Sequence, residues 1–133
     1  GGGHPYRGML YGMTSRMYGK YDVRPIWKLM DDFDIENSAM KGYWLDNSPV
    51  KTNHENIIAT SYLKSDRMLI ALASWSEQDE EVNLDMDWKQ IGFKSNRIFS
   101  PKVDTLQAYQ EFNLEGPITI PKNMGLFLIL EKK

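Results

Sequence analysis

An apolar run and the acidic stretch that follows it constrain the fold of this chain more than any other feature. Residues 68–75 are apolar at nearly every position, which indicates a buried strand. Residues 76–81 are polar and mostly acidic, as in a solvated turn. Val82, Leu84 and Met86 then alternate with polar residues, and this period of two predicts a half-buried strand. The two segments together predict a β-hairpin, and this hairpin contains no catalytic motif.

The period of two holds through most of the chain after residue 38, which predicts an all-β domain. Turn residues (Gly, Pro, Asn, Asp and Ser) separate the expected strands. One helical turn is expected at residues 87–92, where Gly92 closes it. Many short strands at close spacing predict an antiparallel β-sandwich or barrel, and we assign an antiparallel β-sandwich to residues 37–133. The expected strands are residues 39–45, 49–53, 56–63, 67–75, 80–86, 97–104, 106–112, 117–121 and 125–131.

Residues 1–36 follow a different pattern, and we expect them to form an irregular N-terminal lid or linker with a short helix. Residues 6–19 are rich in Gly, Met and Tyr and show neither a helix nor a strand period. Pro25 then begins an amphipathic helix, because apolar residues follow at helical spacing. Acidic residues near the end of this helix oppose its dipole, so the helix should be short. The apolar positions are Ile26, Leu29, Met30 and Phe33, and the acidic ones are Asp31, Asp32 and Asp34.

Two expected strands, residues 68–75 and 126–130, are apolar on both faces. A strand in a sandwich normally buries only one face, so the second face needs its own cover. We expect residues 6–34 to provide this cover. The sequence leaves open which set of side chains lies beneath it. One set is Met68, Ile70 and Leu72 with Phe127 and Ile129, and the other is Leu69, Ala71 and Ala73 with Leu126, Leu128 and Leu130.

Length and charge exclude several classes of protein. A chain of 133 residues is sufficient for one domain with a single core. The net charge is −2 and the basic residues are scattered, so we expect no nucleic-acid partner and no membrane partner. The chain has no cysteine, which excludes disulfides, thiolate zinc sites and a cysteine nucleophile. Residues 1–4 are typical of a linker, and we expect the chain to be a piece of a longer protein.

Acidic and histidine side chains are the first candidates for catalysis. Paired carboxylates could serve glycoside hydrolysis, which needs a proton donor and a nucleophile or base. The acidic clusters, however, lie at a helix end and in a turn, where such residues are usually solvated. His4 and His54 lack a partner motif, and we expect no catalytic residue, metal or cofactor. The two acidic clusters are Asp31, Asp32, Asp34 and Glu36, and Glu77, Asp79, Glu80 and Glu81.

The aromatic residues are the remaining candidates, because their rings could stack on sugar rings. Trp75 and Trp88 flank strands, and we expect them to fill the core or a domain interface. For the others, packing and sugar binding are equally compatible with the sequence. Since most tryptophans are assigned to packing, we expect the isolated domain to bind oligosaccharides weakly or not at all. The candidate carbohydrate-binding residues are Trp44, Tyr43, Tyr11 and Trp27.

The order of these patterns resembles the C-terminal β-sandwich of bacterial glycoside hydrolases, in which a (β/α)₈ catalytic barrel precedes an all-β domain of this size. An apolar strand, Ala73-Ser74-Trp75-Ser76, an acidic turn and an alternating strand occur in that order. Residues 6–14 and 25–33 resemble the segment leaving the barrel in a Bacteroides-type group that is loosely related to family 123 glycosidases. Residues 57–62, 118–121 and 125–131 extend the resemblance to nearly the whole chain.

The resemblance implies a non-catalytic accessory domain that packs on the catalytic barrel of the same polypeptide and stabilises it. It also implies a periplasmic or extracellular location. The family's catalytic carboxylates are expected in the barrel, which needs about 200 residues or more, so none is transferred to this chain. Two alternatives remain open. The chain could be a free-standing carbohydrate-binding module, or a sandwich that binds other proteins.

Overall fold

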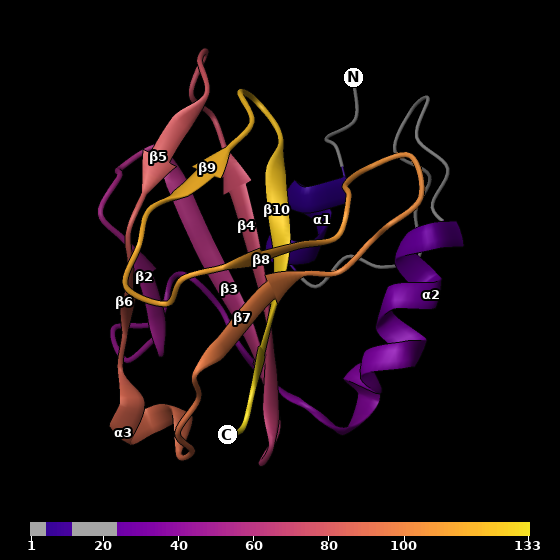
Figure 1. The fold of residues 1–133 in the computed structure, drawn as a ribbon, viewed down its shortest axis with the longest axis vertical. Helices are drawn as coiled ribbons and strands as arrows, with labels where there is room; N and C mark the ends of the chain where they lie inside the picture. Colours follow the sequence, from indigo (N-terminus) through magenta and orange to yellow (C-terminus); the bar gives the residue numbers. More distant parts are fainter. Residues whose placement is uncertain (1–4, 12–23) are drawn as a thin grey trace.

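The computed structural model describes residues 5–11 and 24–133, which form an all-β domain with short helices (Figure 1). This confirms the fold class that the sequence predicts. The helices are α1 (Pro5–Leu10), α2 (Arg24–Phe33), η1 (Ile35–Asn37) and α3 (Trp88–Ile91). The strands are β1 (Ala39–Lys41), β2 (Val50–Thr52), β3 (Ile57–Leu63), β4 (Arg67–Ser74), β5 (Glu80–Val82), β6 (Leu84–Met86), β7 (Arg97–Ser100), β8 (Gln110–Phe112), β9 (Ile118–Ile120) and β10 (Gly125–Glu131).

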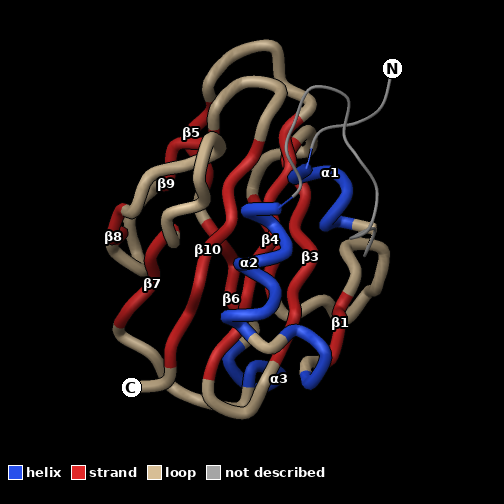
Figure 2. Tube along the Cα trace, turned by 90° about the vertical axis from the view of Figure 1, so that its right-hand side faces the viewer, coloured by secondary structure: helices blue, strands red, loops and turns tan. Residues whose placement is uncertain are grey.

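The domain has three layers around one large sheet. Six antiparallel strands form this sheet in the order β1-β3-β4-β10-β7-β8. Two small two-stranded sheets, β2–β6 and β5–β9, lie across one face. Figure 2 shows α1 and α2 in front of the other face. The central strands β4 and β10 are consequently buried on both sides.

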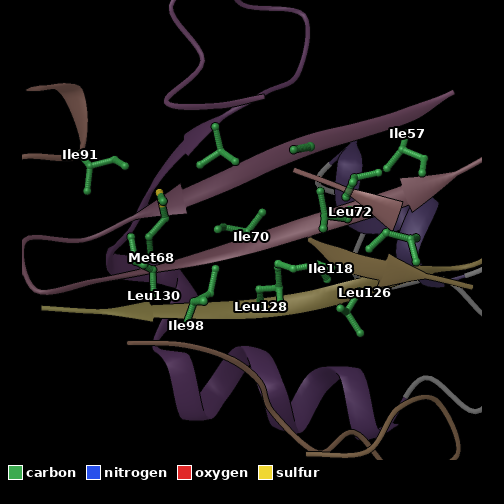
Figure 3. Packing of buried hydrophobic residues seen from close by; sticks show 14 of the residues in the cluster. Ile57, Met68, Ile70, Leu72, Ile91, Ile98, Ile118, Leu126, Leu128 and Leu130 are labelled. Atoms are coloured by element: carbon green, nitrogen blue, oxygen red, sulfur yellow. The ribbon is translucent and has the colours of Figure 1, made fainter. Parts of the chain in front are cut away.

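The first core lies between the large sheet and the two small ones (Figure 3). Val50, Val82 and Ile120 reach it from the small sheets, and Ile91 reaches it from α3. These side chains are almost fully removed from solvent, and burying each one contributes about 1.5–3 kcal/mol. The central strands contribute Met68, Ile70, Leu72, Leu126, Leu128 and Leu130.

The second core lies beneath α1 and α2, as we expected for the N-terminal residues. Ile26, Leu29 and Phe33 occur at helical spacing on α2 and are buried against the sheet. Tyr6 and Met9 of α1 are also buried there. The sheet contributes Tyr62, Leu69, Ala71, Ala73, Phe127 and Ile129 to this core. The described helices therefore cover the second apolar face of the central strands.

Neither of the two groupings expected for the central side chains was correct. In the antiparallel pairing of β4 with β10, Leu126 lies opposite Leu72, and Leu128 lies opposite Ile70. Directly paired residues point to the same face, so the even-numbered residues of both strands share one face. The odd-numbered residues share the other face, beneath the helices. The register between β4 and β10 decides this grouping. The sequence of either strand alone does not specify that register.

The predicted hairpin was also wrong. Both edges of β4 are occupied, by β3 and by β10, so the next segment cannot pair with it. The chain instead passes to the other layer, where β5 pairs with β9 and β6 pairs with β2. The single strand expected at residues 80–86 is thus divided at Asn83 between two sheets.

Residues Pro5–Leu10 form a helix, although we expected an irregular segment there. Hydroxyl groups of β3 satisfy the carbonyl groups at its end. The Thr60 hydroxyl donates to the Leu10 carbonyl at 2.9 Å, and the Tyr62 hydroxyl donates to the Met9 carbonyl. A Cβ atom at Gly125 would lie 2.8 Å from Tyr6, so glycine allows the close approach of α1. These contacts are tertiary, and the local sequence does not reveal them. The rest of the segment expected to be irregular, residues 12–19, lies outside the described residues.

Gln107 completes the hydrogen bonding of β10 where its pairing with β7 ends. The register Ile129 to Phe99, continued by two residues, would place Pro101 opposite Phe127. Proline has no N–H group to donate. The Gln107 side chain takes this place: its amide nitrogen donates to the Phe127 carbonyl at 3.0 Å, and its oxygen accepts from the Phe127 N–H at 2.9 Å.

Deleting residues 1–36 should leave an unstable or aggregating sandwich. The deletion would expose the apolar face formed by Leu69, Phe127, Ile129 and their neighbours. Each lost side chain is worth about 1.5–3 kcal/mol, whereas a whole domain is stable by about 5–15 kcal/mol. Size-exclusion chromatography and thermal melting of the truncated and intact chains would measure the effect.

Two substitutions on α2 control for this deletion. Phe33→Ala removes a buried ring and should lower the free energy of unfolding by about 3–5 kcal/mol. Trp27→Ala, on the exposed side of the same helix, should have a much smaller effect. A truncated chain that stays monomeric and melts within a few degrees of the intact one would contradict the role assigned to α1 and α2.

Candidate functional site

Three of the four predicted aromatic residues meet at the β1 edge of the large sheet. Tyr11 follows α1, and Tyr43 and Trp44 lie in the loop after β1. The rings of Tyr11 and Tyr43 pack edge to face with centroids 5.9 Å apart, and those of Tyr43 and Trp44 do so at 5.2 Å. We call these three residues the aromatic cluster. The fourth, Trp27, lies on a separate element, the exposed side of α2.

The Trp44 ring is held in place although it is exposed. It packs directly on Gly42, where an added Cβ atom would overlap three atoms of the indole. Tyr43 supports it from the side. Thr60 ties this loop to α1, because its hydroxyl accepts from the Tyr43 N–H at 3.2 Å while it donates to Leu10. The cluster is therefore a fixed surface feature.

The Tyr43 hydroxyl stays neutral at physiological pH. A hydrogen bond with Tyr11, together with burial, raises the pKa of Tyr43 above its ordinary value. A neutral phenol both donates and accepts hydrogen bonds. The cluster thus offers apolar ring surface and uncharged polar groups side by side.

A shallow hollow of about 360 Å³ adjoins the cluster. Tyr43 and Trp44 line one part of it, and Asp46, Lys51 and Glu55 line another. The Lys51 ammonium donates to the Asp46 carbonyl at 3.1 Å, which closes the loop between β1 and β2. The hollow therefore combines an aromatic wall with charged groups of both signs.

Trp75 and Trp88 do not fill the core, and the other role expected for them, a place in a domain interface, stays a prediction. Their exposed fractions are 38% and 41%, close to the 44% of Trp27, and Trp44 is 57% exposed. Both residues lie just beyond the strand that they flank, outside the space between the layers. The Arg7 guanidinium covers the Trp75 ring at 4.6 Å. The Trp75 and Trp88 rings are therefore not used in core packing, and the expectation of weak sugar binding stays a prediction.

A hollow of about 730 Å³ beside β6 was not indicated by the sequence. Trp88 lies on its rim, and Leu84, Met86 and Leu114 contribute apolar surface. The register of β5 with β9, if continued, would bring Leu114 opposite Met86, but a turn at residues 113–116 takes the chain away from β6. The hollow is thus the gap where these two segments separate, and no local sequence signal indicates it.

His54 and Glu80 form a polar pair that links two loops. The His54 Nε2 atom lies 3.0 Å from the Glu80 Oε2 atom. The other ring nitrogen, Nδ1, accepts a hydrogen bond from the Asn56 N–H at 3.1 Å. Both nitrogens are therefore occupied, and neither is free to act as a general base. Hydrogen bonds from Gln78 and Ser76, and the proximity of His54, hold the pKa of Glu80 below its ordinary value.

Three other members of the acidic clusters, Asp32, Asp34 and Asp79, make similar structural contacts. Asp32 pairs with Lys28 at 2.7 Å, one turn away on α2. Asp34 binds Asn37 and Lys64, and these contacts lower its pKa. Asp79 accepts from the Lys122 N–H at 2.9 Å. Within residues 5–11 and 24–133, no group of three or more histidine or acidic side chains is placed to hold a metal ion.

Comparison with known families gives one match. The sequence model described as glycoside hydrolase 123, C-terminal domain, matches residues 22–131. No curated protein and no solved structure matches the chain. In the described part of the chain, no helix has the length and apolar character needed to cross a membrane.

The stabilising effect of Glu80 should depend on pH. Because its pKa in the folded protein lies below the ordinary value of 4.5, its contribution is present above pH 4.5 and is lost as the pH falls through the folded value. Glu80→Gln should therefore lower the melting temperature at pH 7, and this difference from the native chain should shrink below pH 4.5. Thermal melts between pH 3 and pH 7 would show this.

Glu77→Gln provides the control, because Glu77 is an exposed acid in the same turn. It should change the melting temperature little at any of these pH values. A Glu80→Gln effect that remains constant down to pH 3 would show that the charge of Glu80 is not what stabilises the loop.

Proposed function

The chain belongs to the family glycoside hydrolase 123, C-terminal domain, and we propose that it is the non-catalytic accessory domain of a glycoside hydrolase. The extent of the match supports this proposal. Residues 22–131 include every element from α2 to β10, whereas α1, which contributes Tyr6, Met9 and Leu10 to the second core, lies outside the match. The similarity therefore concerns most of the fold and not a short motif.

The proposed partner is a catalytic (β/α)₈ barrel in the same polypeptide, in an enzyme of the Bacteroides type. A barrel of this kind needs about 200 residues or more and alternating strands and helices. The described residues form an all-β domain instead. On this proposal the reaction takes place in the barrel, and the accessory domain supports it.

The contacts of the polar side chains support a non-catalytic role. Most glycoside hydrolases use a pair of carboxyl groups that flank the scissile bond. Asp32, Asp34 and Glu80 are instead bound to neighbouring residues in arrangements that stabilise loops and helix ends. His54 is held at both ring nitrogens.

We assign the docking surface to the outer side of α2. The inner side of this helix is buried against the sheet, whereas Trp27 points outward and is nearly half exposed. Tryptophan is enriched among the residues that dominate binding energy in protein interfaces. The Lys28–Asp32 ion pair lies beside it and would form part of a polar rim.

The isolated chain should show no glycosidase turnover. A panel of aryl glycosides, with release of the phenol followed by absorbance, would test this over the pH range 4 to 8. Asp31→Asn and Asp32→Asn serve as comparison variants. Turnover that either substitution abolishes would place a catalytic carboxylate in this chain and would overturn the proposal.

The docking surface is tested in the full-length hydrolase. Trp27→Ala should lower its melting temperature by a few degrees, because loss of a central interface side chain costs more than about 1 kcal/mol. Trp88→Ala is the matched control: Trp88 has nearly the same exposed fraction but lies on the α3 side of the domain. Equal effects of the two substitutions would contradict the assignment of the interface to α2.

A further inference from the structure

We propose that Trp44 is a binding platform for one neutral pyranose ring, so that the loop between β1 and β2 gives the hydrolase a sugar contact outside its catalytic barrel. The inference rests on the proposed function, because membership of a glycoside hydrolase makes a glycan the ligand available to this surface. It goes further in naming a residue, a ligand class and a mode of contact.

The Trp44 ring has a fixed position. Trp44 is the most exposed of the four tryptophans, and yet its indole packs on Gly42 and against Tyr43. An exposed side chain normally loses rotamer freedom when it binds a ligand, and this loss opposes binding. Here the fold has already restricted the ring, so a ligand meets a surface that is ready to bind.

The surface around Trp44 matches the two kinds of surface on a sugar. A pyranose ring has an apolar face of C–H groups, which suits the exposed indole, and a rim of hydroxyl groups. Each hydroxyl can both donate and accept a hydrogen bond. Charged side chains line the adjoining hollow and can form hydrogen bonds with these hydroxyl groups. They are Asp46, Glu55 and Lys51.

Size and charge restrict the ligand further. The hollow, at about 360 Å³, lies near the lower end of the range for small-molecule sites, about 300–1,000 Å³, which favours a single ring. Apart from His54, which is bound to the Glu80 carboxylate, the charged side chains of its lining are two carboxylates and one ammonium, an excess of one negative charge. This charge disfavours uronic acids and other anionic sugars, and neutral hexoses or N-acetylhexosamines fit best.

The experiment is a titration of the full chain with methyl glycosides of neutral hexoses and N-acetylhexosamines, and with methyl glucuronide as the anionic probe. Tryptophan fluorescence and isothermal titration calorimetry report binding. We expect saturable binding of a neutral glycoside with a Kd near the millimolar range, and at least tenfold weaker binding of the glucuronide. Trp44→Ala should weaken binding of the neutral glycoside at least tenfold.

Gly42→Ala is the decisive variant, because it keeps every polar and aromatic group of the site but displaces the Trp44 ring. It should also weaken binding at least tenfold while the melting temperature stays close to that of the native chain. Trp88→Ala, which removes an exposed tryptophan elsewhere, should leave the Kd unchanged. Circular dichroism melts establish that each variant is folded.

Three results would overturn the inference. One is no saturable binding of any neutral glycoside, and another is equal binding by the native chain and Trp44→Ala. The third is loss of binding in Trp88→Ala alone, which would place the sugar in the hollow beside β6. If the chain shows neither turnover nor sugar binding, only this inference is overturned. If the chain itself shows turnover, the proposed accessory role is overturned. The titration then still decides whether Trp44 binds sugar.

Discussion

The pairing of β4 with β10 is the interaction on which the rest of the structure depends. Both strands are apolar on both faces, and together they form the centre of the six-stranded sheet. A sheet of this kind is stable only when both faces are removed from water. The two small sheets cover the face of the even-numbered residues, and α1 and α2 cover the face of the odd-numbered residues. The three-layer arrangement follows from this requirement.

Side chains from distant parts of the chain satisfy backbone groups where regular elements end. Thr60 and Tyr62 bind the last carbonyl groups of α1, and Gln107 replaces the missing partner of β10 beside Pro101. Arg67 donates to the Phe33 carbonyl at 2.9 Å and so binds the end of α2, where acidic residues alone would be unfavourable. Buried backbone groups need such partners, so these residues fix how the layers are joined.

The same arrangement separates stabilising surfaces from surfaces that can meet a partner. The inner side of α2 is committed to the sheet, while Trp27 remains on the outer side. The loop after β1 lies at the edge of the sheet, where Trp44 can be exposed and still be supported by Gly42. On our proposals, one of these surfaces packs on a catalytic barrel and the other offers a sugar contact.

The sequence by itself determined the all-β class, the positions of most strands and the amphipathic helix α2, because hydrophobic period is a local property. It also singled out Tyr11, Tyr43 and Trp44, but it could not bring them together, since Tyr11 and Tyr43 are far apart along the chain. Only the tertiary structure decided the partner of β5, the face to which Leu126 and Phe127 point, and the exposure of Trp75 and Trp88. Strand register, occupied strand edges and contacts between distant residues decide these features, and none of them is contained in any one segment of the chain.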